Sequence, residues 1–210
     1  MKVLTLPGVF TPHSDSWLLL DAVDRLGPIG GRDALDVCTG SGVVAIGLAQ
    51  RGARTFAVDI SRRAALSARA NALRCGARVR VLRGDLFDPV GDTRFDLITS
   101  NPPYVPGPAG PASGAARAWE AGDDGRRSIR AIVAAARARL RPGGILLLVH
   151  SSLVGERQTL DDLVAHGFDP GVVLRRTGPL GPLMRAQQAA GRIDGGIDHE
   201  DLVVFAGIRR

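Results

Sequence analysis

The sequence has few cysteines and no long apolar run. Its two cysteines, Cys38 and Cys75, lack the paired spacing of metal ligands, and the four histidines are scattered, so no metal site is expected. So few thiols are typical of a reducing compartment. No apolar run approaches the roughly 20 residues that cross a bilayer, and Pro7 interrupts the N-terminus too early for a secretion signal. We therefore expect a cytoplasmic protein without contact to a membrane.

Lysine is almost absent: Lys2 is the only lysine among 27 basic residues, and the formal net charge is +6. A basic excess can indicate a partner rich in phosphate. Here the arginines are spread through the whole chain, which indicates a compositional bias and gives little support to nucleic-acid binding. With six phenylalanines, two tryptophans and one tyrosine, aromatic side chains are also too few for an RNA stacking platform.

The 210 residues, 45% of them hydrophobic, are enough for one domain with a full core. Apolar segments of strand length alternate with segments of helical periodicity. Strands are expected at residues 34–38, 55–59, 79–82, 95–100, 145–150, 172–174 and 202–208, and helices at residues 14–26, 43–50, 128–140, 155–165, 184–190 and after a Ser61 cap. This pattern predicts an α/β fold, a doubly wound, mostly parallel seven-stranded sheet, in a single domain over residues 1–210. Ligands bind such sheets at the carboxyl ends of the strands.

Side-chain spacing predicts which residues share a helix face, and composition marks two long connections. The sets expected to share a face are Leu19, Val23 and Leu26; Leu66, Ala70 and Leu73; and Ile129, Ile132, Val133, Ala136 and Leu140. Residues 106–116 and 177–199 are rich in glycine and proline. Each is either a solvent-exposed connection or a loop that contacts the substrate.

A glycine-containing turn follows the first predicted strand, in the sequence Asp36-Val37-Cys38-Thr39-Gly40-Ser41-Gly42. Its glycines allow a tight turn and close approach of a ligand, and the next helix offers unpaired N–H groups. Dinucleotide enzymes usually have a third glycine here, where this chain has Ala45. The glycine pair alone also fits an ordinary strand-to-helix turn. Cys38 ends an apolar run and is expected to be a small buried residue, not a nucleophile.

Two carboxylates follow the next two predicted strands. Asp59 can accept hydrogen bonds from both hydroxyls of a ribose, or it could cap the helix that follows. Asp85 can accept a hydrogen bond from the exocyclic amine of adenine, while Ile60 or Leu86 covers a face of the ring. Polar groups at the ends of three successive strands predict a nucleoside site, which both NAD enzymes and methyltransferases use.

The sequence Asn101-Pro102-Pro103-Tyr104 directly follows the fourth predicted strand. Two successive prolines restrict φ and lack N–H donors, so they form a rigid turn. The Asn101 side-chain oxygen and the Pro102 carbonyl can together accept both hydrogens of an –NH2 group, and Tyr104 offers an aromatic face to a planar group. This arrangement predicts N-methylation by positioning and electrostatics. A purely structural proline turn is the alternative.

Together these motifs resemble those of the HemK-type methyltransferases, over residues 7–208. That family methylates the glutamine of the Gly-Gly-Gln motif in translation release factors. The resemblance implies a class I (Rossmann-like) methyltransferase fold, S-adenosylmethionine as cofactor with S-adenosylhomocysteine as product, and a release factor as protein substrate. It implies that the catalytic residues are Asn101, Pro102, Pro103 and Tyr104, and that the cofactor is bound by Asp36, Thr39, Gly40, Gly42, Asp59, Ile60, Asp85, Leu86, Asn101, Thr11 and Pro12.

Residues 10–20 and 118–126 resemble the shorter archaeal and eukaryotic branch of that family, without the separate N-terminal helical domain of the long bacterial members. Residues 1–30 are accordingly expected to border the active site. Short eukaryotic members work with a small zinc-binding partner subunit, and the sequence leaves open whether this chain needs one. Three positions depart from the family pattern: Cys38 stands where glycine is usual, and His13 and Ser14 replace small and acidic residues.

Three classes of function remain open. The first is N5-methylation of a protein glutamine. The second is N-methylation of adenine or guanine in nucleic acid, or of a small metabolite. Enzymes acting on duplex DNA flip the base and usually carry a recognition domain, for which no stretch here is long enough. The third is an NAD-dependent oxidoreductase or a non-catalytic module, neither of which has a use for Asn101-Pro102-Pro103-Tyr104.

Overall fold

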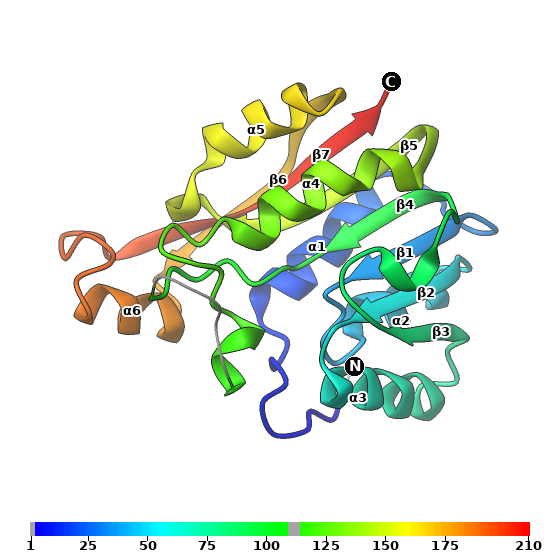
Figure 1. The fold of residues 1–210 in the computed structure, drawn as a ribbon, viewed down its shortest axis with the longest axis horizontal. Helices are drawn as coiled ribbons and strands as arrows, with labels where there is room; N and C mark the ends of the chain where they lie inside the picture. Colours follow the sequence, from blue (N-terminus) through cyan, green and yellow to red (C-terminus); the bar gives the residue numbers. More distant parts are fainter. Residues whose placement is uncertain (1–2, 109–113) are drawn as a thin grey trace.

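A computed structural model describes residues 3–108 and 114–210 of the chain. It contains a seven-stranded sheet in the order β3-β2-β1-β4-β5-β7-β6 (Figure 1). The strands are β1 (Asp33–Val37), β2 (Arg54–Asp59), β3 (Val79–Arg83), β4 (Phe95–Ser100), β5 (Leu140–Ser151), β6 (Phe168–Pro179) and β7 (His199–Arg209). The run from β3 to β5 is parallel, and β7 is antiparallel to both of its neighbours. The predicted doubly wound, mostly parallel sheet is confirmed.

Helices cover both faces of the sheet (Figure 1). They are α1 (Ser14–Arg25), α2 (Val43–Gln50), α3 (Arg62–Arg74), α4 (Arg127–Arg139), α5 (Glu156–Ala165) and α6 (Pro182–Ala189). α1, α2 and α3 pack on one face, whereas α4 and α5 pack on the other. Among the described residues, no helix is both long and apolar enough to span a membrane.

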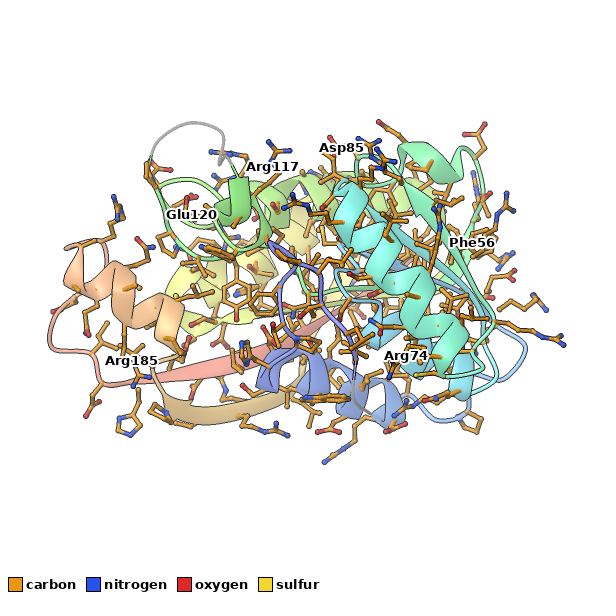
Figure 2. All side chains as sticks on the ribbon, turned by 90° about the horizontal axis from the view of Figure 1, so that it is seen from below. Phe56, Arg74, Asp85, Arg117, Glu120 and Arg185 are labelled. Carbon is orange, nitrogen blue, oxygen red and sulfur yellow. The ribbon has the colours of Figure 1, made fainter. Side chains whose placement is uncertain are left out.

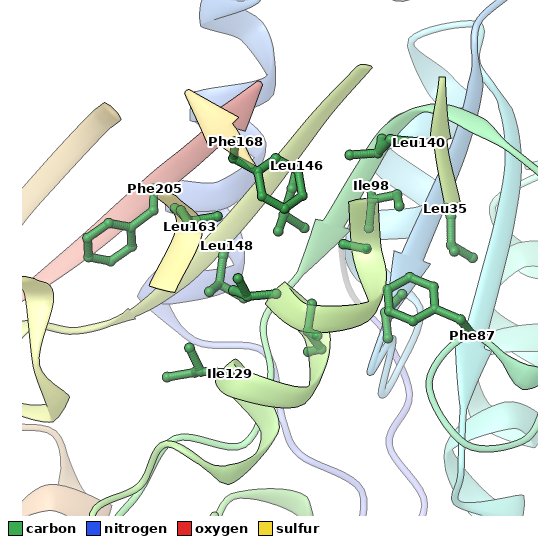
Figure 3. Packing of buried hydrophobic residues seen from close by; sticks show 14 of the residues in the cluster. Leu35, Phe87, Ile98, Ile129, Leu140, Leu146, Leu148, Leu163, Phe168 and Phe205 are labelled. Atoms are coloured by element: carbon green, nitrogen blue, oxygen red, sulfur yellow. The ribbon is translucent and has the colours of Figure 1, made fainter. Parts of the chain in front are cut away.

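The largest hydrophobic cluster lies between the sheet and the helices α4 and α5. Figure 3 shows Ile129 of α4, Leu148 of β5 and Leu163 of α5 within it. The predicted buried face of α4 is confirmed for Ile129, Ile132, Val133 and Ala136, which are fully buried, whereas Leu140, predicted as its last member, is buried as the first residue of β5. Each buried side chain of this size contributes about 1.5–3 kcal/mol. This packing makes the sheet a rigid support for the loops at its carboxyl edge.

The face of α3 that contacts the sheet is made of small residues. Leu66, Ala70 and Leu73 share one face, as predicted, but that face is exposed to solvent. The buried residues of this helix are Ala64, Ala65, Ser67, Ala68, Asn71 and Ala72. α3 passes so close to the glycine turn that a Cβ on Gly42 would lie 2.9 Å from the Cβ of Ala68. Leucine would not fit at this contact.

The last two strands are longer than their apolar runs predict. β6 pairs with β7 from Phe168↔Arg209 to Pro179↔His199, so the start of the segment 177–199 is strand and not loop. β6 is the edge strand, and most of its residues are exposed or half-buried. An edge strand tolerates Pro170 and needs no continuous apolar run. The short helix predicted within the segment is confirmed as α6.

Candidate active site

One cavity of about 590 Å³ lies at the carboxyl ends of the parallel strands, a size typical of small-molecule sites. Its walls come from the N-terminal segment, the glycine turn, the ends of β2, β3 and β4, and the start of α6. In Figure 2 the N-terminal segment (blue) crosses between α3, which carries Arg74, and α6, which carries Arg185. The cavity therefore lies at the carboxyl ends of the strands, where the sequence predicts a ligand site.

Asp36 holds the glycine turn against β4. Its side chain is buried, and it accepts hydrogen bonds from Thr39 Oγ1 (2.6 Å) and Thr99 Oγ1 (2.7 Å). Burial raises the pKa of Asp36 to about 7, against the lowering effect of these two hydrogen bonds. Both carboxylate oxygens are thus engaged by threonines, so this residue orients the turn that lines the cavity.

Asp59 joins the glycine turn to the start of α3. Its Oδ2 accepts a hydrogen bond from Gly40 N (2.9 Å), and its Oδ1 accepts one from Ser61 N (2.8 Å). Burial raises the pKa of the Asp59 carboxyl. Ser61 itself caps α3 by accepting a hydrogen bond from Ala64 N (3.3 Å). Asp59 therefore stabilises the start of α3 and also lines the cavity. Each of its carboxylate oxygens has a second lone pair that can accept a hydrogen bond from a ligand.

Cys38 has the backbone conformation that favours glycine. Its φ is 59°, in the left-handed region, which costs a non-glycine residue roughly 1–2 kcal/mol. This explains physically why glycine is usual at the position. Cys38 is only half-buried and lines the cavity, unlike the buried residue expected. Desolvation, and then the charges of Asp59 and Asp36, raise the pKa of its thiol, which disfavours the nucleophilic thiolate.

Most of the other residues predicted to bind the cofactor also line the cavity: Pro12, Thr39, Gly40, Ile60, Asp85 and Leu86. Thr11 and Gly42, both within the described residues, do not line it. Gly42 faces Ala68 instead, with φ at 83°, so its role is to let α3 approach the turn.

Asn101, Pro102, Pro103 and Tyr104 line the end of the cavity that adjoins α1 and α6. The Asn101 side-chain nitrogen donates a hydrogen bond to Ser16 Oγ (3.2 Å), which leaves its Oδ1 as an acceptor for a ligand. The Tyr104 hydroxyl donates to Asp15 Oδ2 (3.3 Å). All four residues of the motif thus line the same cavity as Asp59 and Asp85.

Asp15 and Ser16 orient the motif. Both lie in the N-terminal segment that was expected to border the site, but neither was predicted to contact the motif. They are 2% and 4% exposed, and Ser16 N donates to Asp15 Oδ1 at 2.6 Å. Burial raises the pKa of Tyr104 well above its usual value, and the charges of Asp15 and Glu200 raise it further. The sequence signal was that the polar residues Asp15 and Ser16 directly precede the apolar run 17–20 of the same helix.

The N-terminal segment is held on α3 by Asn71, which is 1% exposed. Asn71 Oδ1 accepts a hydrogen bond from Leu4 N (2.8 Å). Its Nδ2 donates to Leu4 O (2.8 Å) and to Ser41 O in the glycine turn (2.9 Å). One side chain therefore connects the segment that covers the cavity with the turn that forms its floor.

The two long connections also reach the cavity. Gly181, Leu183 and Met184, from the segment 177–199, line it together with Glu200. From the segment 106–116, Gly114 lines it, while residues 109–113 lie outside the described part of the chain. Both segments therefore include cavity-lining residues.

Residues 1–167 match the methyltransferase small domain family. The chain belongs to this family. It is 32% identical over 187 residues to a "Putative protein N5-glutamine methyltransferase" of Methanocaldococcus jannaschii, covering 88% of this chain and 93% of that protein. It is 37% identical over 179 residues to a release factor glutamine methyltransferase of Gloeobacter violaceus, covering 80% of this chain and 62% of that protein.

A solved structure shows the same methyltransferase fold. The Mtq2–Trm112 complex of E. cuniculi, which methylates the termination factor eRF1, superposes with a TM-score of 0.69 at 22% identity, covering 97% of this chain and 99% of that one. The chain spans between 55% and 62% of the length of three bacterial relatives.

The residues that line the cavity fit S-adenosylmethionine. A Cβ on Gly40 would point into open space, so the turn leaves room beside the backbone. Asp59 and Asp85 supply hydrogen-bond acceptors at the ends of β2 and β3, and Ile60 and Leu86 supply apolar surface. A nucleoside bound at this edge of the sheet needs carboxylates to accept hydrogen bonds from its hydroxyls and amine, and apolar side chains to cover its ring.

Proposed function

We propose that this chain transfers a methyl group from S-adenosylmethionine to the side-chain amide nitrogen of a glutamine in a translation release factor. The observation that carries the proposal is the orientation of Asn101. Its nitrogen donates to Ser16, so its oxygen and the adjacent Pro102 carbonyl are the two acceptors for the hydrogens of an –NH2 group.

On this proposal, the residues at the β2 and β3 ends of the cavity bind the methyl donor. Asp59 accepts hydrogen bonds from the ribose hydroxyls, and Asp85 accepts one from the adenine amine, between Ile60 and Leu86. When bound, the donor supplies an electrophilic methyl group on a sulfonium. The N-terminal segment, held by Asn71, covers the donor and limits the access of water.

The acceptor amide is activated by position and not by a strong base. An amide nitrogen is planar because its lone pair is delocalised. Two acceptors on its hydrogens, Asn101 Oδ1 and Pro102 O, aim that lone pair at the methyl carbon. Tyr104 is not the base, because burial raises its pKa and its hydroxyl donates to Asp15. The proton that the nitrogen loses after transfer passes to solvent.

The comparisons support this substrate. The bacterial relative is named for glutamine methylation of release factors, the archaeal relative for N5-glutamine methylation, and the Mtq2 complex for methylation of eRF1. Because Mtq2 is seen in complex with Trm112, a small partner subunit is the first partner to test for this chain.

Incubation with a radiolabelled methyl donor and three acceptors (release factor, RNA and DNA) tests the proposal. We expect label in the release factor, located by mass spectrometry on the side-chain nitrogen of one glutamine. Label in RNA or DNA alone would contradict the protein substrate.

A further inference from the structure

Glu200 is a buried carboxylate with one oxygen unpaired. It is the second residue of β7 and is 9% exposed. Its Oε1 accepts a hydrogen bond from Gly181 N (2.8 Å), just before α6. Its Oε2 is buried and has no hydrogen-bond partner among the described residues. A buried carboxylate oxygen without a donor is costly, so a ligand that brings a donor would be favoured.

Glu200 lies at the acceptor end of the cavity, which is the end lined by Asn101 and Tyr104 where the methyl acceptor is proposed to bind. It lines that cavity together with Asn101 and Tyr104, and its charge raises the pKa of the Tyr104 phenol, in addition to the effect of burial. The nucleoside end, marked by Asp59 and Asp85, is formed by other strands. In Figure 2, α6 lies to the left of the N-terminal segment, whereas Asp85 lies above it and away from α6. A donor for Glu200 is therefore expected from the acceptor and not from the cofactor.

We propose that Glu200 Oε2 accepts a hydrogen bond from a main-chain N–H of the acceptor polypeptide, at or next to the methylated residue. This inference rests on the proposed function. A glutamine whose side-chain amide reaches Asn101 brings its own main chain, with its N–H donors, to the acceptor end of the cavity. A carboxylate is a strong acceptor for them. Asn101 would hold the amide while Glu200 fixes the backbone.

Glu200→Gln separates binding of the substrate from a structural role. Glutamine can keep the oxygen that accepts from Gly181 N, but it replaces Oε2 with an N–H donor, which would face the N–H of the substrate. Loss of one charge-assisted hydrogen bond predicts an increase of about 10- to 100-fold in KM for the release factor. The affinity for S-adenosylmethionine and the thermal midpoint should stay those of wild type.

Asp201→Asn is the matched control. Asp201 is the next residue of β7 and bonds Arg175 and Thr177 instead of lining the cavity. It should leave the KM for the release factor unchanged. If Glu200→Gln gives the same KM as wild type and Asp201→Asn, Glu200 only supports the chain around Gly181 and the proposal is wrong.

Ester-containing acceptor peptides identify the donor. An ester replaces one main-chain N–H at or beside the glutamine, and one such peptide should lose about tenfold in kcat/KM with wild type. The Glu200→Gln enzyme lacks the acceptor oxygen, so its kcat/KM should be the same for the ester peptide and for the parent amide peptide. An equal loss of kcat/KM with both enzymes would overturn the proposal.

A wild-type enzyme that leaves the release factor unlabelled contradicts the proposed function alone. In that case, the protein that the wild-type enzyme labels in a cell extract becomes the acceptor, and its KM is measured with wild type and with Glu200→Gln. Equal KM values for the two enzymes would again overturn the role of Glu200.

Discussion

The side-chain nitrogen of Asn101 donates a hydrogen bond to the hydroxyl of Ser16, 3.2 Å away and 85 residues earlier in the chain. Asn101 follows the central strand β4, whereas Ser16 lies in the first turn of α1. The contact determines which atom of the Asn101 amide is left for a ligand. The proline motif and the N-terminal helix therefore form the acceptor site together.

Ser16→Ala should lower kcat for methyl transfer about fivefold. It removes the acceptor that orients Asn101, and one such hydrogen bond contributes roughly 1 kcal/mol. The affinity for S-adenosylmethionine should stay within twofold of wild type, because Ser16 bonds Asn101 and Asp15 and no group at the nucleoside end. Steady-state kinetics with the release factor measure this, with Ser128→Ala on α4 as control. An unchanged kcat would mean that Asn101 needs no orientation by Ser16.

Asp59→Ala should weaken binding of S-adenosylmethionine by about 1–3 kcal/mol, the usual effect of losing a buried hydrogen-bond partner. It also leaves Gly40 N and Ser61 N without their acceptor, so the thermal midpoint should fall. Titration calorimetry measures the affinity. Asp33→Ala, at the opposite end of β1 and paired with Arg54 and Arg141, is the control that should leave it unchanged. The same affinity in the Asp59 variant would remove this residue from the site.

Asp36 should make stability fall as pH rises. Burial raises the pKa of Asp36 to about 7 in the folded chain, from an ordinary value of 3.8, so between these values only the folded chain holds the proton. The free energy of unfolding then decreases with pH, by at most about 1.4 kcal/mol per unit.

Asp36→Asn lacks this proton. The difference in free energy of unfolding, variant minus wild type, should therefore increase from pH 4 to 7 and level off above. Urea unfolding at several pH values gives this difference, which other titrating groups do not affect. A constant difference would contradict the buried, protonated Asp36.

Asn71→Ala should release the N-terminal segment without disturbing α3. Alanine fits beside the alanines of the buried face, but it removes the bonds to Leu4 and Ser41. Amide hydrogen exchange of residues 4–9 should accelerate, and S-adenosylmethionine should bind several-fold more weakly. Arg74→Ala, on an exposed residue of the same helix, is the control. Unchanged exchange in the Asn71 variant would show that the segment is held by other contacts.

The sequence predicted the order of strands and helices well because apolar runs and glycine turns are local signals. α2 and β4 begin and end at the predicted residues. The buried face of α3 could not be predicted, because it depends on how closely the helix passes Gly42, a contact between distant residues. Leu66 and Leu73 follow the helical period and still face solvent.

The candidate site was predictable where motifs end strands. Asp59, Asp85 and Asn101 were found in this way, and all three line the cavity. The individual contacts of Asp15, Ser16, Asn71 and Glu200 were not predicted, because they depend on burial and on partners far along the chain. A polar side chain on the buried face of a helix or near a strand end is the signal to look for.

Asn101→Ala tests the central claim most directly, with methyl transfer to the release factor and affinity for S-adenosylmethionine measured on the same preparation. The proposed mechanism predicts that transfer is lost, because the amide is no longer held by its hydrogens, while the affinity stays within a few-fold of wild type. A variant that keeps full methyl transfer would contradict it.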